Sequence, residues 1–489
     1  GQTYPYWELC LADGSGENHD MESILKPYLE RDSRIKYKKL NKNLGIAGNT
    51  NAALTMSTGE YIGLLDHDDY LEIDCLYEVA KALEESSSKG MTSEIDILYT
   101  DEDKVREGVF FQPHFKPDFN LDLLRSNNYI CHFFVVRREI AINCKGFSKE
   151  FDGAQDYDFI FRCIEQAKRI VHIPKILYHW RVHQESTADN PHSKLYAFQA
   201  GKRAIEGNLE RKGLSFATVV PMKDLGFYRV IYGLDAKKMQ DLKLSIIIVS
   251  KKPTSSLSGL LSQLRSIQVP HEIVVISSYD KEDDHNVIAY KKPFHFGAMA
   301  NEAAKKSNGN LLLFLSDDVY KIEIHAMNNM IGNAIREDVG VVGGRSYDHH
   351  HRLIQAGLLG DPKKIERKLF QGTKKGFTGY LHKIILQQQV QAVSQDCLLI
   401  DAAKFRQAKG FNEELSEHFF GLELCLKTNR LGYSTIYQPD VMVFKKTDIE
   451  EEKIPSIKDM EYMQKHYSDD LKKGSSYYHE YLHLDDWTL

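Results

Sequence analysis

The sequence predicts an α/β protein with two tandem Rossmann-like domains, each built on a mostly parallel sheet. Its 489 residues exceed what one hydrophobic core normally supports. In addition, the two halves of the chain share a pattern of segments, and apolar strands alternate with amphipathic helices in both halves. Together these three observations indicate the duplication of one domain.

Two segments show the duplication most clearly. Residues 59–69 read GEYIGLLDHDD, and residues 309–318 read GNLLLFLSDD. Each has a glycine, an apolar strand and acids at its carboxyl end. Lys-Gly-Phe at 145–147 recurs at 409–411, and Pro174 recurs as Pro439, so the offset is roughly 250 to 265 residues throughout. This offset is too long for a solenoid of short repeats.

The elements follow from the apolar pattern. Residues 244–249 and 272–277 are expected to be buried strands, with a helix over 255–267 between them. Crossovers of this length predict a parallel sheet covered on both faces. Residues 7–13 correspond to the second of these strands, so the first domain is expected to lack its opening strand and helix in this sequence. Because the chain starts with Gly1, its natural start is expected upstream.

These patterns set the expected domain boundaries. The first domain is expected over 1–205, a connector over 206–241, the second domain over 242–450 and a tail over 451–489.

Composition excludes several classes of protein. The net charge of −6 gives no general attraction to nucleic acid or to an anionic membrane. The seven cysteines are scattered, with no C-x-x-C pair, which indicates reduced thiols and a cytoplasmic location. The longest apolar runs have strand length, far short of a bilayer span.

The acidic sequence Asp66-His67-Asp68-Asp69 is the main candidate site. Carboxylates at the end of a buried strand repel one another and resist desolvation, and a divalent cation removes both penalties. Oxygen ligands favour Mg²⁺ or Mn²⁺, and the carboxyl ends of strands are where such sheets bind ligands. The alternative is that Asp69 caps a helix starting near Leu71.

The order and spacing of further motifs resemble the family 2 glycosyltransferases of the GT-A fold, and in particular bacterial two-domain members of surface polysaccharide synthesis. The resemblance covers nearly the whole chain. The segments that carry it are YPYWEL at 4–9, ADGS at 12–15, NLG at 43–45 with NTNA at 49–52, LLDHDD at 64–69, YTDEDK at 99–104, GAQDYD at 153–158 and YHWRVH at 178–183.

The resemblance implies roles for individual residues. Asp13 would contact the nucleobase or ribose, Asp66 would lie against the ribose and metal, and Asp68 would ligate the metal. Asp156 would be the catalytic base, although Gln155 stands where the family has Glu. His183 would complete the metal and diphosphate site.

Other interpretations of these residues stay open. Asp156 could instead cap a helix. Arg181, with Asp158 and Arg162, would bind acceptor or diphosphate, or the three would form ion pairs between helix and sheet.

The implied reaction is an inverting, metal-dependent transfer of a sugar from a nucleoside diphosphate to a saccharide acceptor. UDP is the preferred nucleotide, with dTDP as the second choice. The acceptor is expected to be lipid-linked, and the protein to associate peripherally with the inner membrane face. A homo-oligomer is also compatible with the sequence. The rival hypothesis is a non-catalytic glycan- or nucleotide-binding assembly protein.

The second domain is expected to have lost the site. In the sequence alignment Asp66 falls on Leu315 and Asp156 on Gly421, and Lys445-Lys446 stands where the first domain has histidines. Lysines there would repel a cation. Asp317 and Asp318 remain, which leaves an unorthodox site as the alternative to a scaffold. His349-His350-His351 follows Tyr347-Asp348, where the domains that the sequence resembles have a hairpin turn, and is expected to be a solvated turn rather than a metal site.

Overall fold

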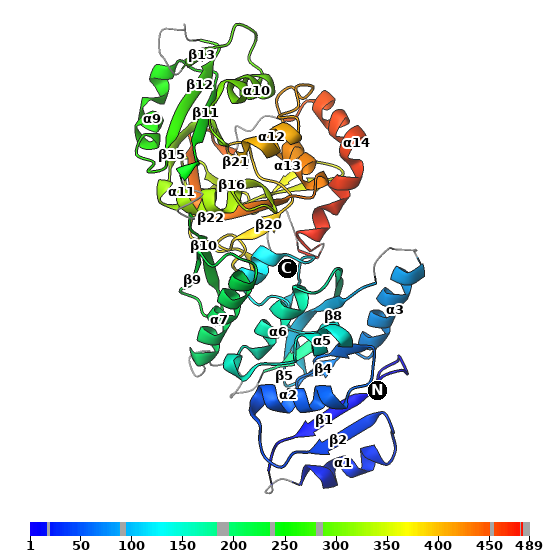
Figure 1. Ribbon diagram of the computed structural model, residues 1–489. Coiled ribbons are helices and arrows are strands. Elements are labelled where there is room, and N and C mark those ends of the chain that lie inside the picture. Colours follow the sequence, from blue (N-terminus) through cyan, green and yellow to red (C-terminus); the bar gives the residue numbers. More distant parts are fainter. Residues whose placement is uncertain are drawn as a thin grey trace. The chain divides into compact units, whose positions relative to one another are not determined.

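The computed structural model of the chain describes residues 1–16, 20–88, 94–182, 195–234, 240–279, 287–449, 454–479 and 481–482. The chain forms two compact units (Figure 1). Unit 1 comprises Gly1–Phe119, Asn127–Ser215 and Val219–Tyr228, and unit 2 comprises Asn120–Ser126, Phe216–Thr218 and Arg229–Leu489. Each unit combines a sheet with flanking helices, which confirms the α/β class.

The sheet of unit 2 has the strand order β13-β12-β11-β14-β21-β16-β22-β15, with β17 beside β16 and β20 beside β22. The strands from β13 to β14 run parallel, and β14 and β21 are antiparallel. The bounds are β11 (Leu244–Ser250), β12 (His271–Ser277), β13 (Val287–Ala289), β14 (Leu311–Ser316), β15 (Val319–Ile322), β16 (Val339–Tyr347), β17 (Leu353–Gln355), β20 (Gln388–Val390), β21 (Cys397–Asp401) and β22 (Ser434–Lys445). A separate hairpin pairs β18 (Leu358–Asp361) with β19 (Ile365–Lys368).

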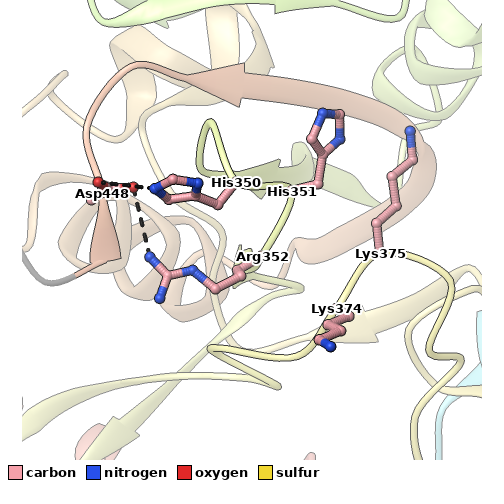
Figure 2. A pocket seen from close by; sticks show the side chains of 6 residues that line it. All are labelled: His350, His351, Arg352, Lys374, Lys375 and Asp448. Carbon is pink, nitrogen blue, oxygen red and sulfur yellow. Dashed lines mark ion pairs between the residues drawn. The ribbon is translucent and has the colours of Figure 1, made fainter.

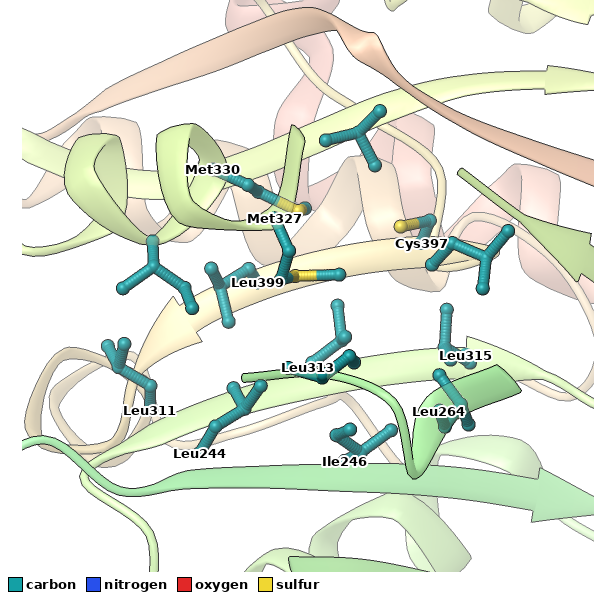
Figure 3. Packing of buried hydrophobic residues seen from close by; sticks show 14 of the residues in the cluster. Leu244, Ile246, Leu264, Leu311, Leu313, Leu315, Met327, Met330, Cys397 and Leu399 are labelled. Atoms are coloured by element: carbon teal, nitrogen blue, oxygen red, sulfur yellow. The ribbon is translucent and has the colours of Figure 1, made fainter. Parts of the chain in front are cut away.

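The helices of unit 2 are α4 (Leu121–Ser126), α9 (Ser258–Leu264), α10 (Phe296–Lys306), α11 (Met327–Ala334), α12 (Ala402–Gln407), α13 (Phe420–Arg430) and α14 (Ile457–Lys472). The core lies between helices and sheet, and Figure 3 shows Met327 and Met330 of α11 facing leucines of β14 and β21. The strands expected at 244–249 and 272–277 are present as β11 and β12. The predicted helix over 255–267 is a 3₁₀ turn over Thr254–Leu257 followed by α9.

Unit 1 has two separate sheets. The larger has the order β3-β7-β5-β8-β4, with β6 beside β5, and the smaller pairs β1 with β2 in parallel. The strand bounds are β1 (Leu9–Asp13), β2 (Ile35–Lys39), β3 (Tyr61–Gly63), β4 (Tyr70–Leu71), β5 (Ile97–Arg106), β6 (Val109–His114), β7 (Phe134–Arg137) and β8 (Ile170–Arg181). The helices are α1 (Met21–Leu29), α2 (Gly45–Met56), α3 (Cys75–Ser88), α5 (Arg138–Asn143), α6 (Gln155–Ile164) and α7 (Leu195–Arg211). Strands β9 (Ala217–Pro221) and β10 (Tyr228–Tyr232) pair with each other.

The main strand orders of the two units correspond, apart from β20 and the β18–β19 hairpin of unit 2 and one gap in unit 1. In unit 2, β11 lies between β12 and β14, whereas in the described part of unit 1 no strand joins β1 to β3. A cavity of about 790 Å³ lies there, with Trp7, Tyr61 and Val135 in its wall. The opening strand that the sequence analysis expects would correspond to β11, and this expectation stays a prediction.

An identical contact in both units confirms the internal repeat. The Asn51 amide bonds to both the backbone N–H and the carbonyl of Phe147, and Asn301 does the same with Phe411. A side chain at Gly146 or Gly410 would collide with the Asn oxygen, and both glycines have positive φ. The repeated Lys-Gly-Phe therefore marks the same turn twice.

The strand registers correct the sequence alignment by one residue. Tyr61 pairs with Arg137 just before α5, and Leu311 pairs with Asp401 just before α12. Asp66 therefore corresponds to Ser316, not to Leu315.

A second correction concerns the helix after the acidic sequence. Helix α3 begins at Cys75, and β4 lies between it and Asp69, so Asp69 is not its cap. Among the described residues no helix combines the length and apolar character needed to cross a bilayer.

A buried ion pair holds α4 within unit 2. The Arg336 guanidinium bonds to both carboxylate oxygens of Asp122 at 2.7 and 3.1 Å, and their side chains are 3% and 0% exposed. Breaking such a pair leaves an uncompensated buried charge. We expect Arg336→Met to lower the free energy of unfolding by roughly 3 to 5 kcal/mol, measured by urea denaturation.

Asp338 provides the matched control for this prediction. It also pairs with Arg336 at 2.7 Å, but its side chain is 55% exposed. Asp338→Asn should cost at most about 1 kcal/mol because solvent screens this pair. Equal costs for the two variants would contradict the assignment of the buried pair as the stabilising one.

Candidate active site

The acidic sequence lies in the turn between β3 and β4, and Asp69 is its best-fixed member. Its carboxylate accepts hydrogen bonds from the Tyr178 hydroxyl at 2.5 Å and the Arg181 backbone N–H at 2.8 Å. Burial raises the pKa of Asp69, and these two hydrogen bonds act against the shift. Asp66 is exposed, and its backbone N–H donates to the same Tyr178 hydroxyl at 3.3 Å.

His132 completes a group that fits a metal ion. One ligating atom from each of Asp66, Asp69 and His132 lies within 4.8 Å of the others. Two carboxylates with an imidazole form a donor set suited to Mn²⁺ and similar divalent ions. The His132 ring stacks on Tyr178, with 4.7 Å between ring centroids, so the residue that orients Asp69 also supports the imidazole.

The backbone around His132 is held by a buried ion pair. Glu102 of β5 accepts from the His132 backbone N–H at 3.2 Å and from the Lys116 ammonium at 3.3 Å. Lys116 also donates to the carbonyls of Ile130 and His132. Burial alone would raise the pKa of Glu102, but Lys116 and nearby imidazoles lower it to about 2. Glu102 is therefore a charged support for the site.

Asp156 lies in the first turn of α6, close to the same group. The Asn128 amide donates to its carboxylate at 3.0 Å. Burial raises the pKa of Asp156, while the charge of His132 opposes and that of Asp66 adds to the shift. The cap position of α6 is Ala154 and carries no side-chain cap bond, so Asp156 is not the helix cap.

Asp13 lies at the end of β1, in the smaller sheet. Its carboxylate accepts from the Ser15 hydroxyl at 2.6 Å and from the Tyr37 hydroxyl at 2.7 Å. Hydrogen bonds from Ser15 and Tyr37 hold the pKa of Asp13 below its ordinary value. Asp13 is thus an ionised acceptor, and its role toward a nucleotide stays a prediction.

The remaining predicted residues have different surroundings. Asp68 is half-buried, 3.7 Å from the His67 ring, and is not part of the three-residue group. The Arg181 side chain is exposed and donates to the Tyr70 hydroxyl at 3.2 Å. His183 lies outside the described residues. The roles of all three stay predictions.

Asp158 and Arg162 form an ion pair within α6. The Arg162 guanidinium bonds to the Asp158 carboxylate at 2.6 Å and to the Gly146 carbonyl at 2.8 Å. In unit 2 Glu423 and Lys427 form the same pair at 3.0 Å. The pair lies within one helix in both units, not between helix and sheet as the alternative expected. Arg162 and Lys427 also bond to the repeated glycine turn, which indicates a structural role.

In unit 2 the equivalent positions hold a different set of charges. By register, His132 corresponds to Asp396 and Trp180 to Lys445. The Lys445 ammonium lies 2.9 Å from Asp396 and 3.4 Å from Asp318. Ser316, at the position of Asp66, donates to Asp396 at 2.7 Å. An internal ammonium therefore neutralises these acids.

Comparison with known proteins places the first part of the chain. Residues 1–144 match the family model described as Glycosyl transferase family 2. The chain is 32% identical over 462 residues to the uncharacterized protein y4gI of Sinorhizobium fredii, covering 90% of this chain and 49% of y4gI. It is 30% identical over 457 residues to the O-antigen biosynthesis protein RfbC of Myxococcus xanthus, covering 89% of this chain and 34% of RfbC.

A shorter relative carries a more specific name. The chain is 26% identical over 195 residues to the UDP-Glc:alpha-D-GlcNAc-diphosphoundecaprenol beta-1,3-glucosyltransferase WfaP of Escherichia coli, covering 40% of this chain and 73% of WfaP. The chain spans about half the length of y4gI and a third of RfbC.

Removing a ligand of the three-residue group should weaken metal binding. We expect Asp69→Asn and His132→Ala each to reduce Mn²⁺ affinity by about tenfold or more, measured by electron paramagnetic resonance of free Mn²⁺. His67→Ala is the control because its side chain is 96% exposed and lies in the same turn. An equal loss in His67→Ala would refute the assignment.

Proposed function

Residues 1–144 belong to glycosyltransferase family 2, and from this premise we propose that the chain is an inverting glycosyltransferase of polysaccharide synthesis. The donor is a nucleoside diphosphate sugar, UDP by preference and dTDP as the alternative. The acceptor is a saccharide, and a lipid-linked one agrees with the diphosphoundecaprenol in the name of WfaP. One observation carries the proposal: a candidate metal group and a half-buried carboxylate, Asp156, share one site.

Asp66, Asp69 and His132 are the residues that would hold the divalent ion, Mn²⁺ or Mg²⁺. Bound there, the ion would supply positive charge for the departing nucleoside diphosphate. Tyr178 orients Asp69 and supports His132, so it positions the group without ligating. Asp68 and His183 are the further ligands proposed from the family resemblance.

Asp156 is proposed to accept the proton of the acceptor hydroxyl. A general base must be ionised and within reach of the proton it takes. The Asn128 amide holds one carboxylate oxygen at 3.0 Å, which fixes the orientation of the side chain. Asp13 and Arg181 are proposed to contact the nucleotide and its diphosphate.

We expect Asp156→Asn to abolish transfer while leaving UDP binding intact, because the amide keeps the shape but cannot accept a proton. Sugar transfer from a UDP-sugar and UDP affinity by calorimetry measure the two properties. His67→Ala should retain both. Equal activity of Asp156→Asn and wild type, or no Mn²⁺-stimulated turnover at all, would favour the non-catalytic assembly protein.

The acid limb of the pH profile offers an independent check. The pKa of Asp156 is raised above its ordinary value of 3.8, and the ionised base is lost as pH falls through the raised value. We therefore expect kcat/KM to decline at a pH above that of an ordinary aspartate, and the limb to disappear from any residual activity of Asp156→Asn. An acid limb that stays unchanged in Asp156→Asn would contradict the assignment of Asp156 as the base.

For the second domain we propose a role without a metal ion. Lys445 is 14% exposed and lies between Asp318 and Asp396, and Gly421 stands where unit 1 has Asp156. Burial acts to lower the pKa of Lys445, but the two carboxylates raise it above the ordinary value. With a fixed ammonium and no base, this domain is proposed to scaffold the enzyme or hold the glycan.

Removing the ammonium should create a cation site in unit 2. In an Asp69→Asn background, which weakens Mn²⁺ binding in unit 1, we expect Lys445→Met to gain Mn²⁺ binding, because Asp318 and Asp396 lose their counter-charge. Lys445→Arg, which keeps the charge, and Lys446→Met, at the exposed neighbour, should gain none. Circular dichroism verifies that each variant folds. A folded Lys445→Met variant that binds no Mn²⁺ would refute the proposal that the Lys445 ammonium takes the place of a metal ion in unit 2.

A further inference from the structure

A second cavity of unit 2 has a strongly basic lining. It measures about 700 Å³ and is lined by His350, His351, Arg352, Lys374, Lys375 and Asp448 (Figure 2). Among the described residues that line it, Asp448 is the one carboxylate, in a chain whose net charge is −6. The lining of this cavity does not include Lys445 or Asp396. The cavity plays no part in the role proposed above for those two residues.

The basic side chains come from two segments joined by backbone hydrogen bonds. The Lys375 N–H donates to the His351 carbonyl at 3.0 Å, and the Leu353 N–H donates to the Thr373 carbonyl at 2.8 Å. These bonds fix the turn after β16 against the loop at 373–375. The lysines are thus held near the histidines by the fold rather than by chance contacts of their flexible side chains.

Asp448 organises the arginine and histidines. Its carboxylate lies 3.1 Å from His349 Nδ1, 3.7 Å from His350 Nε2 and 3.6 Å from the Arg352 guanidinium. Asp348 adds a second contact to Arg352 at 2.8 Å. Lys374 and Lys375 are exposed cations of the wall, and Glu323 acts electrostatically on Lys375.

The Lys375 ammonium lies over the aromatic ring of Phe444. The Lys375 ammonium lies 5.0 Å from the centroid of this buried ring, and His351 packs against the ring at 5.4 Å. An ammonium over an aromatic face keeps its positive charge, because the ring neutralises it only weakly.

The charges of the cavity wall indicate whether its ligand would be a cation or an anion. His349, His350 and Asp448 have ligating atoms within 4.8 Å of one another, as a metal site would. A divalent cation there would face Arg352, Lys374 and Lys375, whose charges repel it. A phosphate group gains from the same charges, and its several oxygens match guanidinium, ammonium and imidazole donors.

We propose that this cavity binds a phosphate-bearing ligand through Arg352, Lys374 and Lys375. The cavity volume is in the range of small-ligand sites, so it admits a diphosphate group, either of a soluble compound or of a lipid headgroup. Asp448 acts as a positioning residue that holds Arg352 and the two histidines in place.

Calorimetry of the full chain with inorganic pyrophosphate tests the proposal, in the presence of EDTA so that no cation bound in unit 1 contributes. We expect Lys374→Gln/Lys375→Gln to weaken pyrophosphate binding by about tenfold or more. The matched control is Lys305→Gln/Lys306→Gln, a pair of adjacent exposed lysines at the end of α10, which should bind like wild type. Thermal unfolding verifies that both double variants stay folded.

A second experiment distinguishes a lipid phosphate from a soluble phosphate compound as the ligand. Co-sedimentation with phosphatidylcholine vesicles that contain phosphatidylglycerol, compared with phosphatidylcholine alone, reports a lipid phosphate. Binding that the 374/375 variant loses and the 305/306 variant keeps, in either arm, supports the proposal. Absence of binding in both arms, equal loss in both variants, or Mn²⁺ binding that requires His349 and His350 would overturn it.

Discussion

The antiparallel pairing of the acid-bearing strand with its neighbour positions the acidic group of each unit. In unit 1 the last residue of β3, Gly63, pairs with Val135 near the start of β7, so His132 lies beside Asp66 and Asp69. In unit 2 the pairing of β14 with β21 brings Asp396 beside Ser316 in the same way. Strand pairing, and not a ligand, therefore brings these charged and polar side chains together in each unit.

The two units then balance these acids differently. Half-buried carboxylates need a counter-charge, since like charges in a low-dielectric setting disfavour ionisation. In unit 1 the available partners are neutral or weakly basic, an imidazole and a tyrosine hydroxyl, which leaves the group suited to a divalent ion. In unit 2 Lys445 provides the positive charge from within the chain. The same scaffold thus carries a metal-compatible group in one unit and an internal ammonium in the other.

The sequence was sufficient for what depends on local pattern. Strands β11 and β12 and the acidic turn follow from apolar runs and their ends. His132 could not be found this way, because its place beside Asp66 depends on which strands pair, and a lone histidine after a cysteine carries no periodic signal. A sequence search for residues that precede the next antiparallel strand would have included it.

Alignment of the repeats failed by one residue for a related reason. The number of residues between β3 and β4 differs from that between β14 and β15, and only the register with β7 and β21 shows where the difference lies. Helix α4 is a further case: its short sequence does not reveal that Asp122 pairs with Arg336, more than two hundred residues away.

Comparing the units separates the residues that the fold requires from those that the site requires. Both units keep the Asn–Phe contact, the positive-φ glycine and the ion pair within the helix that follows it. Asp66, His132 and Asp156 are replaced by Ser316, Asp396 and Gly421, yet the unit around those replacements has a complete sheet and core. Because this fold forms without the first set, folding does not explain why unit 1 places a metal-compatible group next to the half-buried carboxylate of Asp156. A chemical role for that group does explain it.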